Sequence, residues 1–259
     1  MPDLEEAAAV AAARTTAGAP SLDLARRNRL LNELSDADLT ELLREATAPT
    51  LDLGTVLYEP GRPVTAVHFP LTGVISLVTD LGDLVVEAAT VGNEGMSGIS
   101  VFLGAQAPTE RANVQVGGRA IAIGADAFDR GAASVDGPLY AIMRRYTQIL
   151  FTQLARNTAC NRVHTVEQRA ARWLLATADR MDTPTFGLTQ HFLAQMLAVR
   201  RASVSRIAST FAAQGCIRYT RGTLTILDRA QLRTHACSCY QAVRDATDRA
   251  LAAGSTPAS

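Results

Sequence analysis

The spacing of hydrophobic positions changes twice along the chain. Between residues 22 and 46 leucines recur at helical spacing, and Ser35-Asp36-Ala37-Asp38 is typical of a helix start. From Leu51 to about residue 123, short runs of Val, Ile, Leu and Ala are separated by turn residues, which predicts antiparallel strands in a roll or sandwich. From Gly137-Pro138 to about Met181 the period is helical again. The pattern predicts an α+β protein.

The strand region contains four expected turns. Glu59-Pro60-Gly61-Arg62-Pro63 follows the first apolar run, and Leu71-Thr72-Gly73 and Asp80-Leu81-Gly82-Asp83 separate the next three. Gly117-Gly118 lies between Val114-Gln115-Val116 and Ala120-Ile121-Ala122-Ile123, which predicts a hairpin there.

The long helical stretch has a coiled-coil spacing. Leu139, Met143, Tyr146 and Leu150 follow one another at steps of four, three and four, which predicts the seam of a homodimer. The same register continues through polar side chains, which we expect to tune the pairing of the two helices: Gln153, Asn157, Cys160 and His164.

Residues 190–207 fit a helix-turn-helix. The crossing position needs a small residue and has Ala194, and the turn position, where φ is positive and glycine is common, has Ala198. The second helix is expected to end at Gly215, and alternating apolar residues around Thr220-Arg221-Gly222-Thr223 predict a β-hairpin wing. The inner face is filled by Leu193, Leu197, Val199, Val204 and Ile207. A helical hairpin with a solvated basic face is the alternative.

The charge distribution favours a polyanionic partner for the second half of the chain. Net charge is zero, but residues 1–134 hold 9 Arg against 18 Asp and Glu, whereas residues 135–259 hold 16 Arg against 7. Between Asp182 and Asp228 there are five arginines and no carboxylate, a pattern that suits phosphate. We expect phosphate contacts from Thr189, Gln190, Arg200, Ser203, Arg218 and Arg221.

The order of an acidic β-roll, a long helix and a winged helix-turn-helix resembles the bacterial cyclic AMP receptor/Fnr family of transcription regulators. The resemblance covers about residues 28–235. It implies that Arg201 and Arg206 read guanines, with Ser205 and Ala202 beside them on the recognition helix. Ala202 replaces the glutamate usual in the family, so the operator is expected to differ from the commonest family site.

The resemblance also implies partners and domains. We expect a cytoplasmic homodimer that binds a palindromic operator in double-stranded DNA, with RNA polymerase as a further candidate partner and no membrane contact. The expected parts are a flexible tail (1–27), a cyclic-nucleotide-binding-like β-roll (28–136), a dimerisation helix and connector (137–181), a winged helix-turn-helix (182–235), and a C-terminal helix and tail (236–259).

The effector half departs from the cyclic-nucleotide members. If Gly98 matches the glycine of their phosphate cassette, Ile99 replaces the ribose-binding glutamate. The candidate pocket residues are Glu94, Gly98, Arg111 and Leu154. We therefore predict no cofactor and favour a diverged or empty pocket over a cyclic nucleotide.

Other functions find less support in the sequence. The four cysteines suit no disulfide framework, and His235, Cys237 and Cys239 are too close together to hold one metal without strain, so no metal site is predicted. No catalytic motif and no membrane-spanning apolar run is present, so an enzyme is not expected. The remaining alternative is a small-molecule or redox sensor that acts through a protein partner.

Overall fold

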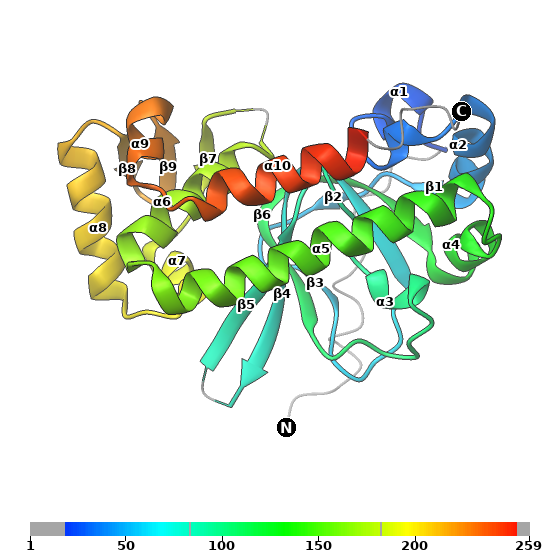
Figure 1. Cartoon of the computed structure of the whole chain (residues 1–259), viewed down its shortest axis with the longest axis horizontal. Coiled ribbons are helices and arrows are strands. Elements are labelled where there is room, and N and C mark those ends of the chain that lie inside the picture. Colours follow the sequence, from blue (N-terminus) through cyan, green and yellow to red (C-terminus); the bar gives the residue numbers. More distant parts are fainter. Residues whose placement is uncertain (1–18, 83, 182, 253–259) are drawn as a thin grey trace.

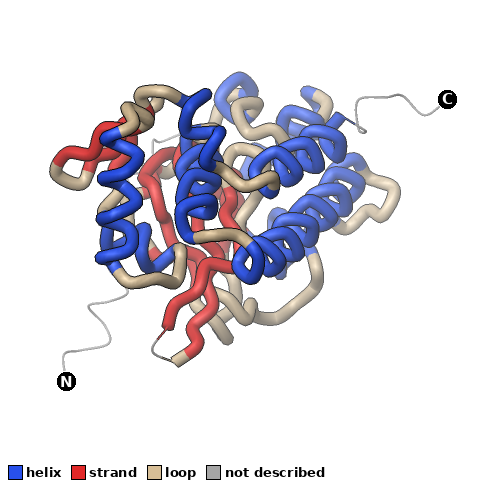
Figure 2. Tube along the Cα trace, turned by 60° about the vertical axis from the view of Figure 1, so that its left-hand side comes forward, coloured by secondary structure: helices blue, strands red, loops and turns tan. Residues whose placement is uncertain are grey.

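The computed structural model describes residues 19–82, 84–181 and 183–252. Figure 1 shows an N-terminal β-roll with short helices and a smaller C-terminal lobe, both lying against one long helix. Figure 2 shows the strands of the roll in red near the centre of the molecule, with helices in blue around them. Among the described residues, no helix combines the length and apolar character that a membrane span requires.

The elements of the N-terminal part agree with the expected helix start and strand region. Ser35 caps the second helix by accepting a hydrogen bond from the Asp38 amide, as predicted. Part of the expected tail is ordered, because residues 22–25 form a helix, whereas residues 1–18 lie outside the described residues. The elements are α1 (Leu22–Ala25), α2 (Asp36–Leu42), β1 (Ala46–Thr47), β2 (Thr50–Leu51), β3 (Val56–Tyr58), β4 (Ala66–Leu81), β5 (Leu84–Val91), α3 (Ile99–Phe102), β6 (Arg111–Gly124) and α4 (Ala125–Ala132), with 3-10 turns at Leu31–Glu33 and Leu43–Glu45.

The C-terminal part continues with the long helix and a winged helix-turn-helix. Its small sheet has the strand order β7-β9-β8. Residues 253–259 of the expected tail lie outside the described residues. The elements are α5 (Pro138–Val163), α6 (Val166–Ala178), β7 (Thr185–Gly187), α7 (Gln190–Met196), α8 (Arg201–Ala213), β8 (Ile217–Thr220), β9 (Thr223–Ile226), α9 (Arg229–His235) and α10 (Cys239–Ala252).

Strand β6 organises the roll, and it contradicts the predicted hairpin at Gly117-Gly118. It runs unbroken from Arg111 to Gly124 and pairs antiparallel with β1, β2, β3 and β4. A Cβ on Gly118 would lie 2.3 Å from the Thr72 carbonyl oxygen. The glycine therefore permits a close approach of two strands where the sequence suggested a turn.

Strand β4 is likewise continuous where a break was expected at Leu71-Thr72-Gly73. Its pairing with β6 shifts register between Thr72 and Val74, and Gly73 has a φ of +88°. This irregularity is a β-bulge that bends the strand. The turn expected after Asp80 is present, because Leu81 pairs with Leu84 across the β4–β5 hairpin and Gly82 has a φ of +70°.

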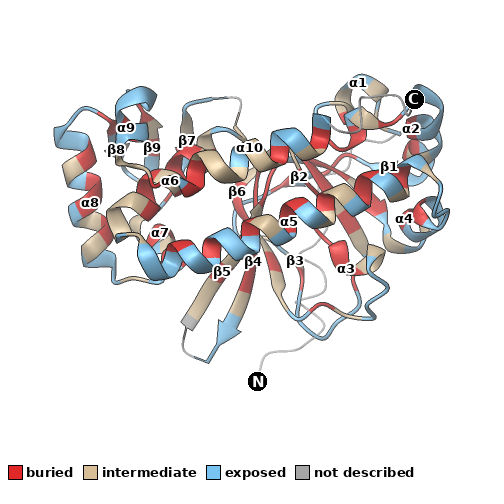
Figure 3. Ribbon diagram, in the orientation of Figure 1, coloured by how far each residue is buried: buried red, intermediate tan, exposed pale blue. Residues whose placement is uncertain are grey.

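Helix α5 begins as predicted, with Pro138 in its first turn, and buried positions alternate with exposed ones along it (Figure 3). Its predicted seam packs on the roll. Met143 is fully buried, and the Tyr146 hydroxyl donates a 2.7 Å hydrogen bond to the Met96 carbonyl. Leu139 and Leu150 join the same core. The heptad pattern correctly marks one buried face, but the chain's own roll covers that face, so these four residues are unavailable to a second copy.

The polar residues that continue this face of α5 form hydrogen bonds to the roll. Strand β5 is an edge strand, which leaves carbonyl groups without a strand partner. Gln153 donates to the Thr90 carbonyl over 3.1 Å, and Asn157 donates to the Ala88 carbonyl over 2.9 Å. These amides satisfy the edge of the sheet, which explains why polar side chains occupy a buried helix face.

The expected long helix is divided at His164. Thr165 caps α6 by accepting from the Gln168 amide, and the Gln168 side chain accepts from the Thr165 amide in return. This capping box starts a new helix in a new direction. It separates α5 from the helix-turn-helix part of the chain.

The C-terminal lobe is docked on the roll by apolar and ionic contacts. Val74, Val78 and Val116 of the roll share a buried cluster with Phe186 and Met196 of the lobe. Beside this cluster a charged pair crosses between the two parts.

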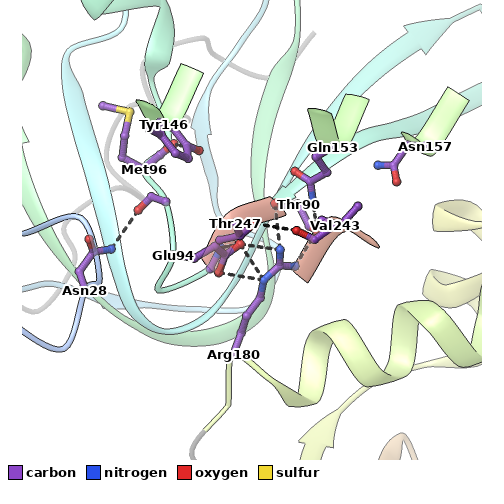
Figure 4. Close-up of polar contacts among 12 residues, drawn as sticks. Asn28, Thr90, Glu94, Met96, Tyr146, Gln153, Asn157, Arg180, Val243 and Thr247 are labelled. Atoms are coloured by element: carbon purple, nitrogen blue, oxygen red, sulfur yellow. Dashed lines mark hydrogen bonds and ion pairs between the residues drawn. The ribbon is translucent and has the colours of Figure 1, made fainter. Parts of the chain in front are cut away.

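The charged pair is formed by Arg180 and Glu94 (Figure 4). The Arg180 Nε donates to the Glu94 Oε1 over 3.0 Å, and its Nη1 donates to the Thr90 hydroxyl over 2.6 Å. A Cβ on Gly92 would lie 2.3 Å from the Arg180 side chain, so a glycine is needed where the arginine passes. Both side chains are largely buried, and breaking one partner of such a pair leaves an uncompensated charge.

The last helix returns to the N-terminal domain. Helix α10 runs antiparallel to α5 and beside it (Figure 1). Leu251 belongs to the core of the roll, and Asp248 lies 2.7 Å from the Arg29 guanidinium. The C-terminal segment thus completes the packing of the first domain.

The turn of the helix-turn-helix generates a stability prediction. Ala198 has a φ of +51°, as expected for the turn position, and a side chain is strained there. We expect Ala198→Gly to raise the free energy of unfolding by about 1 kcal/mol, because glycine adopts this conformation without strain. Thermal or urea unfolding of the two proteins measures the difference.

Ala141→Gly supplies the control, because Ala141 is exposed in the first half of α5. There the same substitution should lower the free energy of unfolding by about 0.5–1 kcal/mol. Equal destabilisation by both substitutions would show that Ala198 carries no strain.

Candidate nucleic-acid interface

Helix α7 begins at the predicted position. The Thr189 hydroxyl accepts a 3.1 Å hydrogen bond from the Phe192 amide, which caps the helix and orients its first turn. Leu193, Ala194 and Leu197 are buried beneath it, as the inner-face pattern requires. The free amides at the start of the helix lie beside Gln190, where a phosphate would be favoured.

Helix α8 divides its residues as the pattern predicted. Val204, Ile207 and Phe211 are buried, and Gly215, with a φ of +74°, follows the helix end. The opposite face is open to solvent. Arg201, Ala202 and Arg206 are exposed there, Ser203 and Ser205 are half-buried, and Arg200 occupies the N-cap position.

The wing is a two-residue hairpin between β8 and β9. Arg221 and Gly222 have φ values of +47° and +80°, which is the type I′ geometry that matches the twist of paired strands. The Tyr219 hydroxyl donates to the Leu188 carbonyl and so ties the wing to the segment that precedes α7. Arg218 is exposed on β8.

The three elements meet at an open surface groove. Four residues predicted from the sequence lie in its lining: Thr189, Gln190, Arg201 and Arg221. His191 and Tyr219 line it too, and sequence reasoning did not single them out. Arg200, Arg206 and Arg218 lie outside the lining residues of the groove but on the exposed surfaces of α8 and β8.

The charge of this surface is uncompensated. Arginines elsewhere face carboxylates, such as Arg111 with Asp80 and Arg130 with Glu45, each at 2.8 Å. Within the described part of the chain, the five arginines of residues 200–221 form no ion pair with a carboxylate. A surface of one sign attracts a polyanion.

A buried arginine supports the turn from behind. Arg169 on α6 donates a 2.6 Å hydrogen bond to the Leu197 carbonyl at the end of α7. Sequence reasoning missed this residue, although it lies on the face of α6 that is otherwise Ala, Trp and Leu. A charged residue on an apolar helix face is the signal that could have identified it.

The predicted effector residues are not brought together. Glu94 pairs with Arg180, Arg111 pairs with Asp80 at the start of β6, and Leu154 is 37% exposed on the outer face of α5. Gly98, with a φ of +97°, precedes the short helix α3. The four residues therefore have separate surroundings.

A different cavity lies between the two domains. It has a volume of about 240 Å³, and α10 forms one wall, opposite β5, α5 and α6. Glu87 lines it and accepts a 2.7 Å hydrogen bond from the Ser76 hydroxyl. Burial raises the pKa of Glu87 to about 7, against the opposing effects of Ser76 and the nearby guanidinium of Arg172.

Known proteins share both the domain and the fold. The Crp-like helix-turn-helix domain family matches residues 168–235. FixK2 from Bradyrhizobium japonicum has a TM-score of 0.63 at 16% identity, with 74% of this chain and 98% of that chain covered. A CRP-family transcriptional regulator from Thermus thermophilus has a TM-score of 0.61 at 19% identity, covering 72% of this chain and 95% of that one.

A third likeness is to the c-di-GMP responsive global regulator CLP of Xanthomonas campestris, with a TM-score of 0.58 at 13% identity, covering 75% of this chain and 100% of that one. No curated protein matches the chain in sequence. The family match and the structural likenesses lead to one assignment. The chain has the fold of the solved Crp/Fnr transcription regulators, and residues 168–235 match the Crp-like helix-turn-helix domain family.

Proposed function

We propose that the protein is a sequence-specific DNA-binding transcription regulator that acts as a homodimer. The observation that carries this proposal is the groove between the start of α7, the start of α8 and the wing, which is rich in arginine and free of carboxylates. A recognition helix beside such a groove suits the major groove of DNA, with phosphates on either side.

The proposed DNA contacts are of two kinds: some position the protein on the phosphate backbone, and others read the bases. Arg221 on the wing and the capped start of α7 are placed for phosphates, and Arg200 and Arg218 extend the same positive surface. Arg201 and Arg206 stand on the exposed face of α8, where a guanidinium can donate two hydrogen bonds to a guanine edge. Ala202 offers no carboxylate to read cytosine.

The outward face of α5 supports a revised dimer contact. Phe151 is 65% exposed in the middle of this helix, and Leu154 lies one turn further along the same face. Large apolar side chains on the open face of a long helix are stabilised when a second helix covers them. For such a pair to bind a palindromic operator, its two recognition helices have to lie about 34 Å apart, which is one turn of DNA.

Signal input is proposed to differ from that of the cyclic-nucleotide members. Arg111 is held by Asp80, and if Gly98 matches the cassette glycine, Ile99 takes the position of the ribose-binding glutamate of those members. The cavity walled by α10 is the better candidate for a small effector, because it touches both domains and contains Glu87, Arg172 and Arg180.

Base reading is tested by Arg201→Ala and Arg206→Ala. Each should cost about 1–3 kcal/mol on an operator selected from random DNA and relax base choice at one position per half-site. Binding to random DNA should change little, because the exposed side chains do not support the core. Arg233→Ala on α9, outside the groove, is the control. Equal losses of affinity for the operator and for random DNA would show that both arginines contact phosphates and do not read bases.

The wing is tested by Arg221→Asn. Asparagine tolerates the left-handed conformation of this position, so the turn is kept while the charge is removed. Affinity should fall alike on all sequences, and the slope of log affinity against log salt should flatten by about one unit. Titrations at several salt concentrations measure this slope, and an unchanged slope would place the wing outside the interface.

The dimer contact is tested by Phe151→Glu. A pair of carboxylates buried at the contact should give monomers and lower operator affinity by at least about tenfold. Val135→Glu is the control, because Val135 is 66% exposed in the loop before α5. Sedimentation velocity distinguishes the species. A Phe151→Glu protein that remains dimeric would show that the contact lies elsewhere.

A further inference from the structure

Three cysteines and one histidine from distant parts of the sequence converge where the end of α5 meets the connection between α9 and α10. They are Cys160, His164, Cys237 and Cys239, and their ligand atoms all lie within 4.8 Å of one another. The sulfur atoms of Cys160 and Cys237 are 3.5 Å apart, and the Cys239 sulfur lies 3.7 Å from Nδ1 of His164. All three cysteines are buried and form a cluster of their own, apart from the two apolar cores.

The backbone presents these side chains in two pairs. Cys160 and His164 are four residues apart at the end of α5, so they lie on one face, and His164 is the C-cap residue. Cys237 lies in the short connection between α9 and α10, and Cys239 is the first residue of α10. His235, the histidine nearest to Cys237 and Cys239 in the sequence, does not join them, because it faces Glu167 at 3.2 Å and packs on Phe211.

The spacing of the four ligand atoms suits one tetrahedral ion. Zinc–sulfur bonds of about 2.3 Å give a sulfur–sulfur edge of about 3.8 Å in a tetrahedron, close to the separations in this cluster. Three thiolates and one imidazole are a common ligand set of structural zinc sites. An iron–sulfur cluster would spread its cysteines over several iron atoms and hold them further apart.

We propose that Cys160, His164, Cys237 and Cys239 bind a single Zn²⁺ ion that fastens the end of α5 to the α9–α10 connection. The ion would take all four ligands from the protein and leave no open position, which is the arrangement of a structural site. It would replace the protons of three thiols, so binding strengthens as pH rises.

A cation stands beside the cluster, and it offsets the net negative charge that three thiolates leave around Zn²⁺. The guanidinium of Arg172 lies close enough to the sulfur atoms of all three cysteines to act on their charge. Arg172 also donates a 2.8 Å hydrogen bond to Asn157, which holds it beside the cluster.

The proposed ion lies next to two other functional parts of the molecule. Helix α10 carries Tyr240, Val243 and Thr247 into the wall of the interdomain cavity, and Cys239 anchors the first turn of this helix. Arg169, which holds the turn of the helix-turn-helix, lies close enough for Cys160 and Cys237 to act on its charge. The ion would therefore fix the wall of the cavity and the support of the DNA-reading turn together.

Metal analysis of the untagged full-length protein, purified under reducing conditions, tests the proposal. We expect one zinc per chain by elemental mass spectrometry. A thiol-modifying mercurial should release that zinc after three cysteines have reacted. After removal by a chelator, Co²⁺ alone should rebind with one equivalent and give the intense thiolate-to-cobalt absorption and visible bands of a tetrahedral site.

Variants assign the ligands. Cys237→Ser and His164→Ala should lose the stoichiometric metal, and each should lower the midpoint of thermal unfolding. Cys216→Ser should keep the metal, because Cys216 is a buried free thiol in a different part of the lobe. His164→Cys, which offers four thiolates, should keep it as well, and this variant guards against a ligand substitution that merely prevents folding.

Four results would each overturn the proposal. Wild-type protein that neither retains zinc nor rebinds Co²⁺ would exclude the site. Iron with inorganic sulfide would show a cluster in place of one ion. A disulfide between Cys160 and Cys237 after reducing purification would remove two ligands. Undiminished metal in both Cys237→Ser and His164→Ala would place the ion elsewhere.

Discussion

The ion pair between Arg180 and Glu94 holds the two halves of the molecule in one arrangement. It lies where water is largely excluded, so each charge depends on the other, and Thr90 and Gly92 shape the passage that the guanidinium fills. The cavity beside Glu87 and the wall that α10 contributes to it both lie around this pair. A disturbance on the β5 side therefore reaches the connector that leads into the helix-turn-helix.

Local patterns in the sequence were sufficient for the DNA-facing part. The inner-face residues of 190–207, the strained turn at Ala198, the terminal Gly215 and the wing at Arg221-Gly222 are each set by neighbours within a few residues, and the structure has them as expected. The fold class followed from the same local signals. Interactions of this kind are determined by backbone conformation and short-range packing, which sequence spacing encodes directly.

Long-range contacts were beyond such reasoning. The heptad of α5 showed that Met143 and Tyr146 lie on a buried face, but no spacing tells whether a second copy or the chain's own roll buries it. The pair Gly117-Gly118 is typical of a turn, whereas in the structure Gly118 lets β6 approach Thr72 closely. Glu94 lines the interdomain cavity, but its partner there, Arg180, is remote in sequence and could not be identified from spacing. The convergence of Cys160 and His164 with Cys237 and Cys239 is a long-range contact of the same kind.

The burial of Leu251 in the core of the first domain has a consequence for biosynthesis. A ribosome releases the N-terminal domain long before the last helix, and domains ordinarily fold in that order. Here the core that contains Phe69 and Met143 is completed by Leu251 on α10, which is synthesised after the whole helix-turn-helix domain. The nascent roll therefore keeps an open apolar surface until α10 has been synthesised, and translation that stalls before this helix, or truncation that removes it, would expose that surface to aggregation or proteolysis.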